Sequence, residues 1–342
     1  MEITFDLNTI WFFLIGILLV GYAILDGFDL GVGALHLFVK DDLERRIMLN
    51  SIGPVWDGNE VWLVTGGGAL FAAFPHVYAT VFSGFYDAIM VLVFMLIFRA
   101  VAIEFRSKRP MKWWRQMWDV AFSVASVLIA FIAGVTIGNI VTGIPIGADK
   151  EFSGTILSLI NPYTILVGIT TVALFTMHGA IYGVMKTEGE LQIKLRSWVN
   201  NTIIFFIICY ITTTMATLIY YPHMIKHFKE FPPLFILALL NMLAIANIPR
   251  EISKGKEFLA FLSSCASIAA ILSLFAFGIF PNIVLASNDA ANSLTIYNSA
   301  SSQKTLEIML IIALSGIPFV LAYTISIYWI FRGKVKLNNM SY

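Results

Sequence analysis

Charged residues are scarce in this sequence: Asp, Glu, Lys and Arg make up 13% of its 342 residues. A soluble domain carries about twice that fraction, so a water-soluble globular protein is excluded. The formal net charge of +1 identifies no partner by itself, and we expect no nucleic acid among the partners.

Groups that hold redox centres are also few. The two cysteines, Cys209 and Cys265, lie in apolar runs without metal-ligand spacing, which favours buried structural thiols. Of five histidines only His178 lies well inside an apolar run, whereas bis-histidine haem ligation needs two facing histidines at one depth. No CxxCH motif or Walker loop is found, and no GxGxxG occurs in a strand–helix setting. We therefore expect no haem with paired axial ligands from this chain, and expect His178 to be a hydrogen-bonded interhelical residue.

Long apolar runs are abundant, since 58% of the residues are hydrophobic. Runs of roughly 20 residues are long enough to cross a bilayer as helices. The start, "MEITFDLN", has two acids and no basic n-region, so it does not resemble a cleaved signal peptide. These features predict an all-α polytopic membrane protein with nine transmembrane helices. The predicted spans are 9–38, 53–75, 77–106, 119–143, 161–186, 199–221, 232–249, 257–281 and 305–332.

The ends of the first and fifth spans are similar: each has a glycine-containing helix end followed by an acidic and then a basic loop. This similarity suggests a parallel internal repeat. We expect two four-helix bundles plus one additional helix. Residues 1–150 would hold the first bundle, residues 151–285 the second, and residues 286–342 an outer loop, the last helix and the tail.

Lysine and arginine orient these spans, because they accumulate on the cytoplasmic side. The loops on one side hold 17 of the 22 cations, four lie on the other side, and Arg99 lies within a span. The 17 are Lys40, Arg45, Arg46, Arg106, Lys108, Arg109, Lys112, Arg115, Lys186, Lys194, Arg196, Arg250, Lys254, Lys256, Arg332, Lys334 and Lys336. The N-terminus is thus predicted outside and the C-terminus in the cytoplasm.

Carboxyl groups inside the first two spans are the most informative feature. Asp26 and Asp29 share one face of the first helix, and Asp57 and Glu60 lie near the start of the second. Arg99 of the third span reaches a similar depth. A carboxylate buried in hydrocarbon costs several kcal/mol unless it is protonated, paired or hydrated. Such groups are suited to relaying protons.

A structural interpretation stands beside this one. Acids near the start of a helix complement its dipole and cap free N–H groups, which applies to Asp57 and Glu60. Arg99 is expected to be a structural counter-ion, with Trp56 and Asn59 as structural neighbours.

Isolated features nearby have simpler explanations. Asp87, in the outer half of the third span, is an isolated acid. We expect the glycines at 66–68 and the Gly27/Gly31 pair to let helices approach closely.

The chain resembles subunit II of cytochrome bd-type quinol oxidases. The matching segments are "DGFDLGVG" (26–33), "ERRIMLNSIGPVWDGNEVWLVTGGGALFAAFP" (44–75), "SGFY" (83–86), "RSK" (106–108) and "NSLTIYNSASSQKTL" (292–306). The resemblance implies a bacterial plasma-membrane complex in which subunit I holds two haems b and one haem d. That complex would oxidise quinol, reduce O₂ to water with cytoplasmic protons, and form a proton gradient without pumping.

The same resemblance implies that Asp26, Asp29 and Asp57 deliver protons, with Glu60 at a position where relatives carry glutamine. Some members lodge a structural quinone in this subunit. Membrane lipid and a small accessory subunit are further partners that the family allows.

Three hypotheses therefore stand side by side. The first is a haem-free subunit of a quinol oxidase that packs against subunit I and contributes a proton path. The second is a proton-coupled secondary transporter, because buried acids suit that function too. The third is a structural scaffold whose acids are paired with cations of subunit I.

Overall fold

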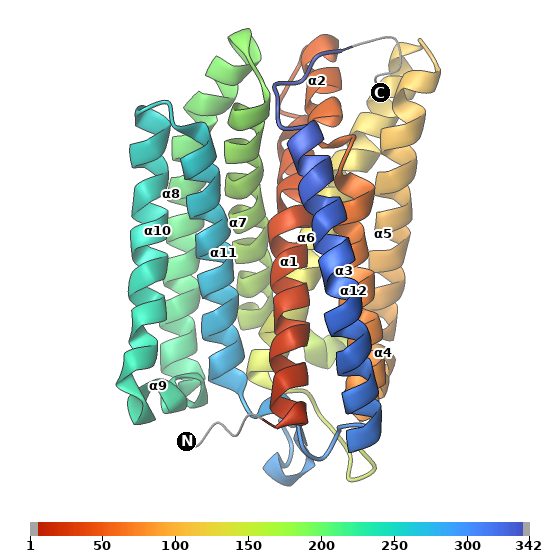
Figure 1. Ribbon diagram of the computed structural model, residues 1–342, viewed down its shortest axis with the longest axis vertical. Helices are drawn as coiled ribbons and strands as arrows, with labels where there is room; N and C mark the ends of the chain where they lie inside the picture. The colour runs from red at the N-terminus through yellow and green to blue at the C-terminus, as the bar shows by residue number, and fades with distance from the viewer. Residues whose placement is uncertain (1–5, 338–342) are drawn as a thin grey trace.

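The computed structural model describes residues 6–337, which form a bundle of long helices with short helices and loops at both ends (Figure 1). The long helices are α1 (Leu7–His36), α3 (Trp56–Ala73), α5 (Tyr86–Phe105), α6 (Lys112–Thr142), α7 (Pro162–Lys186), α8 (Gly189–Tyr220), α10 (Phe235–Ser253), α11 (Glu257–Ile279) and α12 (Gln303–Ile330). The short helices are α2 (Asp42–Ile52), α4 (Pro75–Gly84) and α9 (Lys226–Glu230), with 3₁₀ turns at η1 (Arg106–Lys108), η2 (Ile156–Leu159), η3 (Pro222–Ile225), η4 (Pro232–Leu234) and η5 (Ala290–Asn292).

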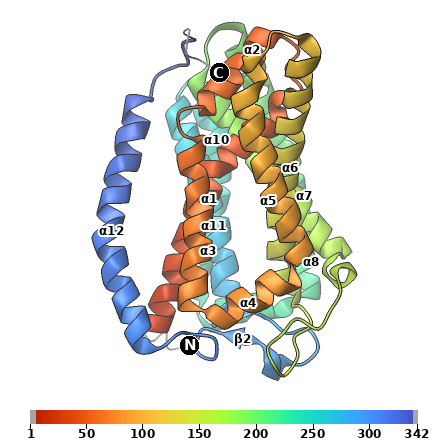
Figure 2. The ribbon, with the colours of Figure 1, turned by 90° about the vertical axis from the view of Figure 1, so that its right-hand side faces the viewer.

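Successive long helices run in opposite directions, so the bundle has two distinct ends (Figures 1 and 2). We call the end where α1 begins the N-terminal end. The other end carries Arg45, Arg106 and Arg115, and we call it the basic end.

Side-chain caps mark where several helices begin. Asp6 accepts a hydrogen bond from the backbone N–H of Thr9 (2.8 Å) at the start of α1. Asn161 caps α7 in the same way, with Pro162 in the first turn, where a missing N–H costs nothing. Asp41 caps α2 through the N–H of Glu44 (3.0 Å). This cap explains why a helix forms where the sequence predicted only a loop between the first two spans.

Eight helices of the described chain are long and apolar enough to cross a membrane, so the polytopic all-α fold is confirmed. The helix that does not meet this criterion is α3, whose first turns hold Asp57, Asn59 and Glu60. The exact number of nine spans is therefore not confirmed, although a long helix overlaps each predicted span.

Several predicted boundaries were wrong. The fourth and sixth spans begin before the predicted residues 119 and 199, because α6 starts at Lys112 and α8 at Gly189. The third span does not begin at residue 77: α4 lies across the N-terminal end, and α5 starts only at Tyr86 (Figure 2). Gly84 ends α4 against Phe152, and a Cβ at Gly84 would lie 2.8 Å from the Cγ of that ring. The seventh span does not stop at 249, because α10 continues through Pro249 to Ser253.

Helices α1 and α7 lie at the centre and pack against each other. Around α1 pack α3 and α6, and around α7 pack α8 and α11, while α5 packs on α6 and α10 on α11. We call α1, α3, α5 and α6 the first helix group, and α7, α8, α10 and α11 the second.

The contact between the two groups depends on glycine. A Cβ on Gly31 would overlap the carbonyl oxygen of Phe175, and one on Gly179 would overlap the backbone of Gly31. The predicted packing role of Gly27 and Gly31 is confirmed. For Gly67 and Gly68 it was wrong within this chain, because a Cβ there meets nothing within 4 Å.

Helix α12 stands apart from both groups along most of its length (Figure 2). Near its start Leu306 is buried, and its carbonyl oxygen accepts a hydrogen bond from the indole N–H of Trp11 (2.9 Å). Towards its far end Ile327 and Tyr328 pack on the core. The helix is therefore held at its two ends.

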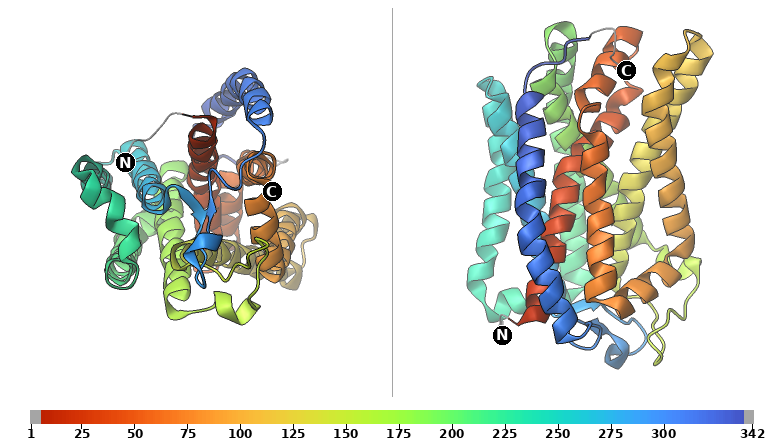
Figure 3. Two further views of the ribbon diagram at one scale, coloured as in Figure 1. Left: turned by 90° about the horizontal axis from the view of Figure 1, so that it is seen from below. Right: turned by 45° about the vertical axis from the view of Figure 1, so that its right-hand side comes forward.

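The segment before α12 forms an ordered cap over the N-terminal end (Figure 3). Strand β1 (Asn282–Val284) pairs with β2 (Leu294–Thr295) in an antiparallel hairpin. The N–H of Ser301 donates to the carbonyl of Ala73 (2.9 Å), which fastens the cap to the end of α3.

Candidate functional site

Two of the four predicted carboxyl groups, those of Asp26 and Glu60, pair with one arginine. The side chain of Asp26 is fully buried on α1, and its Oδ1 lies 2.7 Å from Nη1 of Arg99. The Oε2 of Glu60 on α3 accepts a hydrogen bond from Nη2 of the same guanidinium at 2.9 Å. Arg99 itself is 0% exposed. This one side chain of α5 thus connects α1, α3 and α5, and the predicted counter-ion is observed.

Asp29 is held differently, through an amide. It is 1% exposed, and its Oδ2 accepts a hydrogen bond from Nδ2 of Asn59 at 2.7 Å. The same amide nitrogen donates to the carbonyl of Leu25 (3.1 Å), while the hydroxyl of Tyr328 donates to Oδ1 of Asn59 (2.7 Å). Asp29 therefore has no guanidinium or ammonium group of the described residues in direct contact.

Asp57 does not join this cluster. It is exposed on the surface of α3, one helical turn before Glu60, and it forms no hydrogen bond or ion pair with residues 6–337. Neither acid caps α3, because Val55 is the N-cap and no side chain bonds there. Trp56 is buried in the core beside this turn, as expected for a structural neighbour.

Sequence reasoning missed two tyrosines at the cluster. Tyr22 is buried one turn before Asp26 on α1, and the i, i+4 spacing could have indicated it. Tyr328 lies 269 residues from Asn59, so no local pattern could have placed it there.

A second buried carboxyl group was also missed. Asp119 on α6 is 1% exposed and accepts from Nε of Arg106 (2.5 Å) and Nη1 of Arg45 (2.9 Å). His36 of α1 contacts its Oδ1 through Nε2 at 2.5 Å, and Arg106 continues to Asp42 on α2 (2.7 Å).

This Asp119 network joins α1, α2, η1 and α6 at the basic end. Two guanidinium groups beside one carboxylate hold it ionised and repel a proton. We interpret the network as a structural clamp. The cations that form it had served in the sequence only as indicators of orientation.

Away from the basic end, where Lys186 and Glu251 are buried, the second helix group buries neutral polar groups instead. His178 contacts the hydroxyl of Ser264 through Nδ1 (2.7 Å) and the carbonyl of Ile24 through Nε2 (3.0 Å). Asn241 donates to the hydroxyl oxygen of Tyr210 (2.9 Å) and accepts from that of Ser267 (2.7 Å). The prediction of an interhelical His178 is confirmed.

These contacts bear on haem binding. Both ring nitrogens of His178 are engaged, and His36, His223 and His227 each use Nε2 for an oxygen of this chain. Within residues 6–337 no cluster of three His, Cys, Asp or Glu residues could hold a metal ion. The two cysteines are free; Cys209 is buried, whereas Cys265 is only partly so. Four of the five histidines are thus hydrogen-bonded within the chain, and His76 is exposed on α4.

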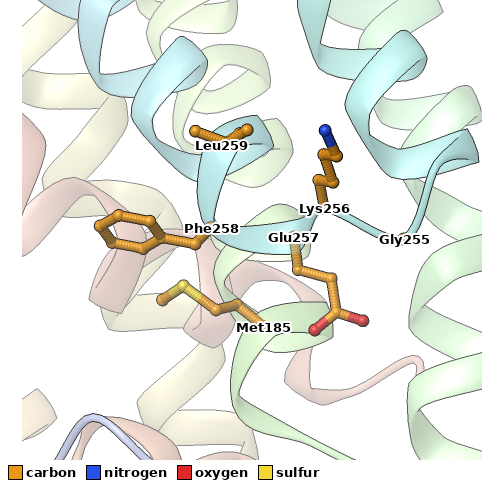
Figure 4. Close-up of a pocket in the computed structure, with 6 residues that line it drawn as sticks. All are labelled: Met185, Gly255, Lys256, Glu257, Phe258 and Leu259. Atoms are coloured by element: carbon orange, nitrogen blue, oxygen red, sulfur yellow. The ribbon is translucent and has the colours of Figure 1, made fainter.

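A shallow hollow opens at the basic end of the second group (Figure 4). It is lined by Met185, Gly255, Lys256, Glu257, Phe258 and Leu259. The carboxylate of Glu257 is already bound by Arg196 (2.6 Å) and Lys334 (2.7 Å). None of the predicted site residues lines this hollow.

The helices and buried acids define a multi-pass membrane subunit built around an intramembrane carboxyl cluster. Residues 7–331 match the family described as cytochrome bd terminal oxidase subunit II. The chain belongs to this family, which confirms the resemblance seen in the sequence and places the chain in an oxidase complex. Membership also implies a partner subunit and haem cofactors in that complex.

Known relatives agree over nearly the full length. Cytochrome bd-I ubiquinol oxidase subunit 2 of Escherichia coli (strain K12) is 34% identical, over 98% of this chain and 96% of the relative. Cytochrome bd ubiquinol oxidase subunit 2 of Bacillus subtilis (strain 168) is 35% identical, over 97% of each. A chain of the bd oxidase from Geobacillus thermodenitrificans has the same fold, with a TM-score of 0.76 over 95% of this chain and 98% of its own, at 15% identity.

Proposed function

We propose that this chain is the haem-free second subunit of a cytochrome bd quinol oxidase, and that it carries protons from the basic end towards the site of O₂ reduction. The observation that supports the proposal is the cluster of three carboxyl groups around Arg99, in which Asp26 and Asp29 are almost completely buried. Family membership decides against the secondary-transporter alternative.

Charge balance in the cluster explains why it suits proton transfer. Asp26 and Glu60 share a single guanidinium group, and the third acid, Asp29, is bonded only to the neutral amide of Asn59 among the described residues. If all three were ionised, the cluster would hold a net negative charge in a medium that solvates it poorly, at a cost of several kcal/mol. Accepting a proton relieves that charge. A carboxyl group that is stabilised by protonation, and lies beside other carboxyl groups that are stabilised in the same way, can transfer a proton to its neighbour.

The exposure of the acids gives this path a direction. Asp57 is exposed, the Glu60 side chain is 20% exposed, and Asp26 is fully buried. Asp57 and Glu60 are neighbours at i, i+3 on one helix. We propose that protons reach Asp57 first, pass to Glu60, and continue to Asp26 and Asp29.

The exposed face of α3 suits a contact with subunit I. Asp57 lies on it together with the apolar residues Val61 and Val64, and Gly67 and Gly68 leave open space further along. Lipid would solvate an exposed carboxylate poorly, whereas glycine lets a second helix approach closely. A helix of subunit I would cover Asp57 and shield the entrance of the path from lipid.

The remaining assignments follow the family. Subunit I would hold two haems b and one haem d, which supply electron transfer from quinol and the reduction of O₂. A structural quinone and a small accessory subunit are further components of the proposal. The cationic basic end would face the cytoplasm of the bacterial cell, with the N-terminus outside. The two helix groups would be two four-helix units, residues 1–150 and 151–285, followed by the cap, α12 and the tail.

A scaffold role is the second candidate, because Arg99 already pairs with two of the acids. In a scaffold the acids would stay ionised through turnover. Infrared difference spectra of the complex distinguish the two, since a proton carrier shows a carboxyl C=O band that changes with redox state.

The direct test replaces Asp26, Asp29 and Asp57 singly with Asn in the complete complex. We expect quinol oxidation per haem to fall at least tenfold for each, as for the loss of a group that transfers protons. Asp87→Asn is the matched control, because Asp87 is an exposed acid at the start of α5 outside the cluster. Parent-like turnover in all three Asn variants, at normal haem content, would contradict the proposal.

A further inference from the structure

Tyr328 has no role in the proton path described above, yet it contacts Asn59, which in turn binds Asp29. It lies on α12, which is otherwise largely exposed. Its hydroxyl donates to Oδ1 of Asn59 at 2.7 Å, and Nδ2 of Asn59 donates to Oδ2 of Asp29 at 2.7 Å. The last helix is thus connected to a buried acid of the first through one amide.

The orientation of this amide decides whether the nitrogen or the oxygen of Asn59 faces Asp29. An Asn side chain presents two donors on one side and an acceptor on the other. With Tyr328 donating to Oδ1, the nitrogen faces Asp29 and the carbonyl of Leu25 (3.1 Å). Within residues 6–337, Asn59 is the group that donates a hydrogen bond to Asp29. A donor to a carboxylate stabilises its ionised form.

Removal of the tyrosine hydroxyl would upset this arrangement. Asn59 is 2% exposed, so its Oδ1 would be left buried without a donor, which is unfavourable. The neighbouring group that could supply a donor is Asp29 in its protonated form. The amide would turn over so that its Oδ1 faces Asp29, and Asp29 would then keep its proton in order to donate a hydrogen bond to that oxygen.

We infer that Tyr328 is a positioning residue of the proton path, which acts through Asn59 to keep Asp29 able to release its proton. The inference rests on the proposed function of Asp29 as a proton carrier. Tyr328 itself lies outside the series of acids and transfers no proton in this scheme.

The test is Tyr328→Phe in the complete oxidase complex, which removes one oxygen and keeps the ring. We expect turnover per haem to fall about fivefold, the effect of one buried hydrogen bond. The carboxyl C=O band that disappears in Asp29→Asn should shift in frequency in Tyr328→Phe, because its hydrogen bonding changes. A purely structural tyrosine would leave that band in place.

The second helix group offers a matched control. Tyr210 is half-buried like Tyr328 and also bonds an asparagine, since its hydroxyl oxygen accepts from Nδ2 of Asn241 (2.9 Å). That asparagine contacts Ser267 and no acid. Tyr210→Phe should therefore lose a comparable hydrogen bond while turnover and the Asp29 band stay as in the parent.

The double variant Tyr328→Phe/Asp29→Asn separates a direct effect from an indirect one. If Tyr328 acts through Asp29, the double variant is as slow as Asp29→Asn alone, because effects of coupled residues do not add. The role of Tyr328 would be overturned if the losses of turnover in the two single variants multiplied in the double variant. It would also be overturned if the C=O band of Asp29 did not shift in Tyr328→Phe, or if Tyr328→Phe turned over as fast as Tyr210→Phe. Parent-like turnover of Asp29→Asn would instead overturn the proposed function of Asp29, and with it this inference.

Discussion

The first helix group buries carboxyl groups around a guanidinium, whereas the second buries an amide, hydroxyl groups and a neutral histidine. Asp26, Glu60 and Arg99 join α1, α3 and α5 in the first. Asn241 with Tyr210 and Ser267 joins α8, α10 and α11 in the second. Both sets fasten helices together within a similar architecture.

At the basic end the second group also buries Lys186 and Glu251. Away from that end, however, buried charge is not needed to hold its four helices together. Neutral hydrogen bonds do so in the second group without the desolvation cost of an ion pair. The carboxyl groups of the first group therefore call for an explanation other than packing, and proton transfer supplies one. Each of the following variants tests whether the buried polar residues of the first group serve function, and those of the second group serve stability alone.

Arg99→Leu should have the largest effect on stability. It leaves the buried Asp26 and the partly exposed Glu60 without their counter-ion, and breaking a buried pair such as Arg99–Asp26 costs about 3–5 kcal/mol. We expect a lower haem yield and a lower melting temperature of the detergent-solubilised complex. Adding Asp26→Asn and Glu60→Gln should restore part of the loss. A parent-like melting temperature of Arg99→Leu would show that the cluster is not held by this pair.

Gly31→Ala should weaken the contact between the two groups. The new Cβ would overlap the carbonyl oxygen of Phe175, and overpacking typically costs about 1–3 kcal/mol. Gly16→Ala is the control on the same helix, because a Cβ there meets nothing within 4 Å. Thermal unfolding followed by haem release compares the two. Equal stability of both variants would mean that α1 and α7 can separate without loss.

Asn241→Leu should lower stability without slowing turnover. It removes a partner of both Tyr210 and Ser267, at a cost of about 1–3 kcal/mol. Asn59→Leu should lose a comparable amount but also turn over more slowly, because it removes the donor to Asp29. Quinol oxidation per haem is the measurement. Slow turnover of a well-assembled Asn241→Leu complex would remove the functional distinction between the groups.

His178→Gln should have the smallest effect, below about 1 kcal/mol, because a glutamine can retain one of the two hydrogen bonds to Ser264 and Ile24. The haem absorption bands of the complex should be unchanged. Loss or displacement of a band would show that His178 takes part in cofactor binding after all.

The sequence was sufficient for the long apolar helices and for the charged residues of the cluster. Long apolar runs predicted the spans, and acids within them marked Asp26, Asp29 and Glu60, because such groups are costly in hydrocarbon. The similar depth of Arg99 indicated a counter-ion, and the structure shows which two acids it pairs with, Asp26 and Glu60. Features of this kind can be predicted from the sequence because each depends on the residues of a single helix.

Features that depend on distant contacts could not be predicted. Asp119 carries no local signal, and its partners come from α1, α2 and η1. The turn at Phe85 that separates α4 from α5 depends on Phe152 packing against Gly84. Asp57 was placed correctly along α3, but the side of the helix that faces outward is decided by which neighbours pack against it.

The position of Tyr328 near the C-terminus has a consequence for biosynthesis. A ribosome completes α12 after every other long helix of the described chain has been made. Until then Asn59 lacks the hydroxyl group that donates to its Oδ1, so a chain released early could insert and fold its two helix groups and still have an incomplete hydrogen-bond network beside Asp29. The amide beside Asp29 thereby distinguishes a finished polypeptide from a truncated one.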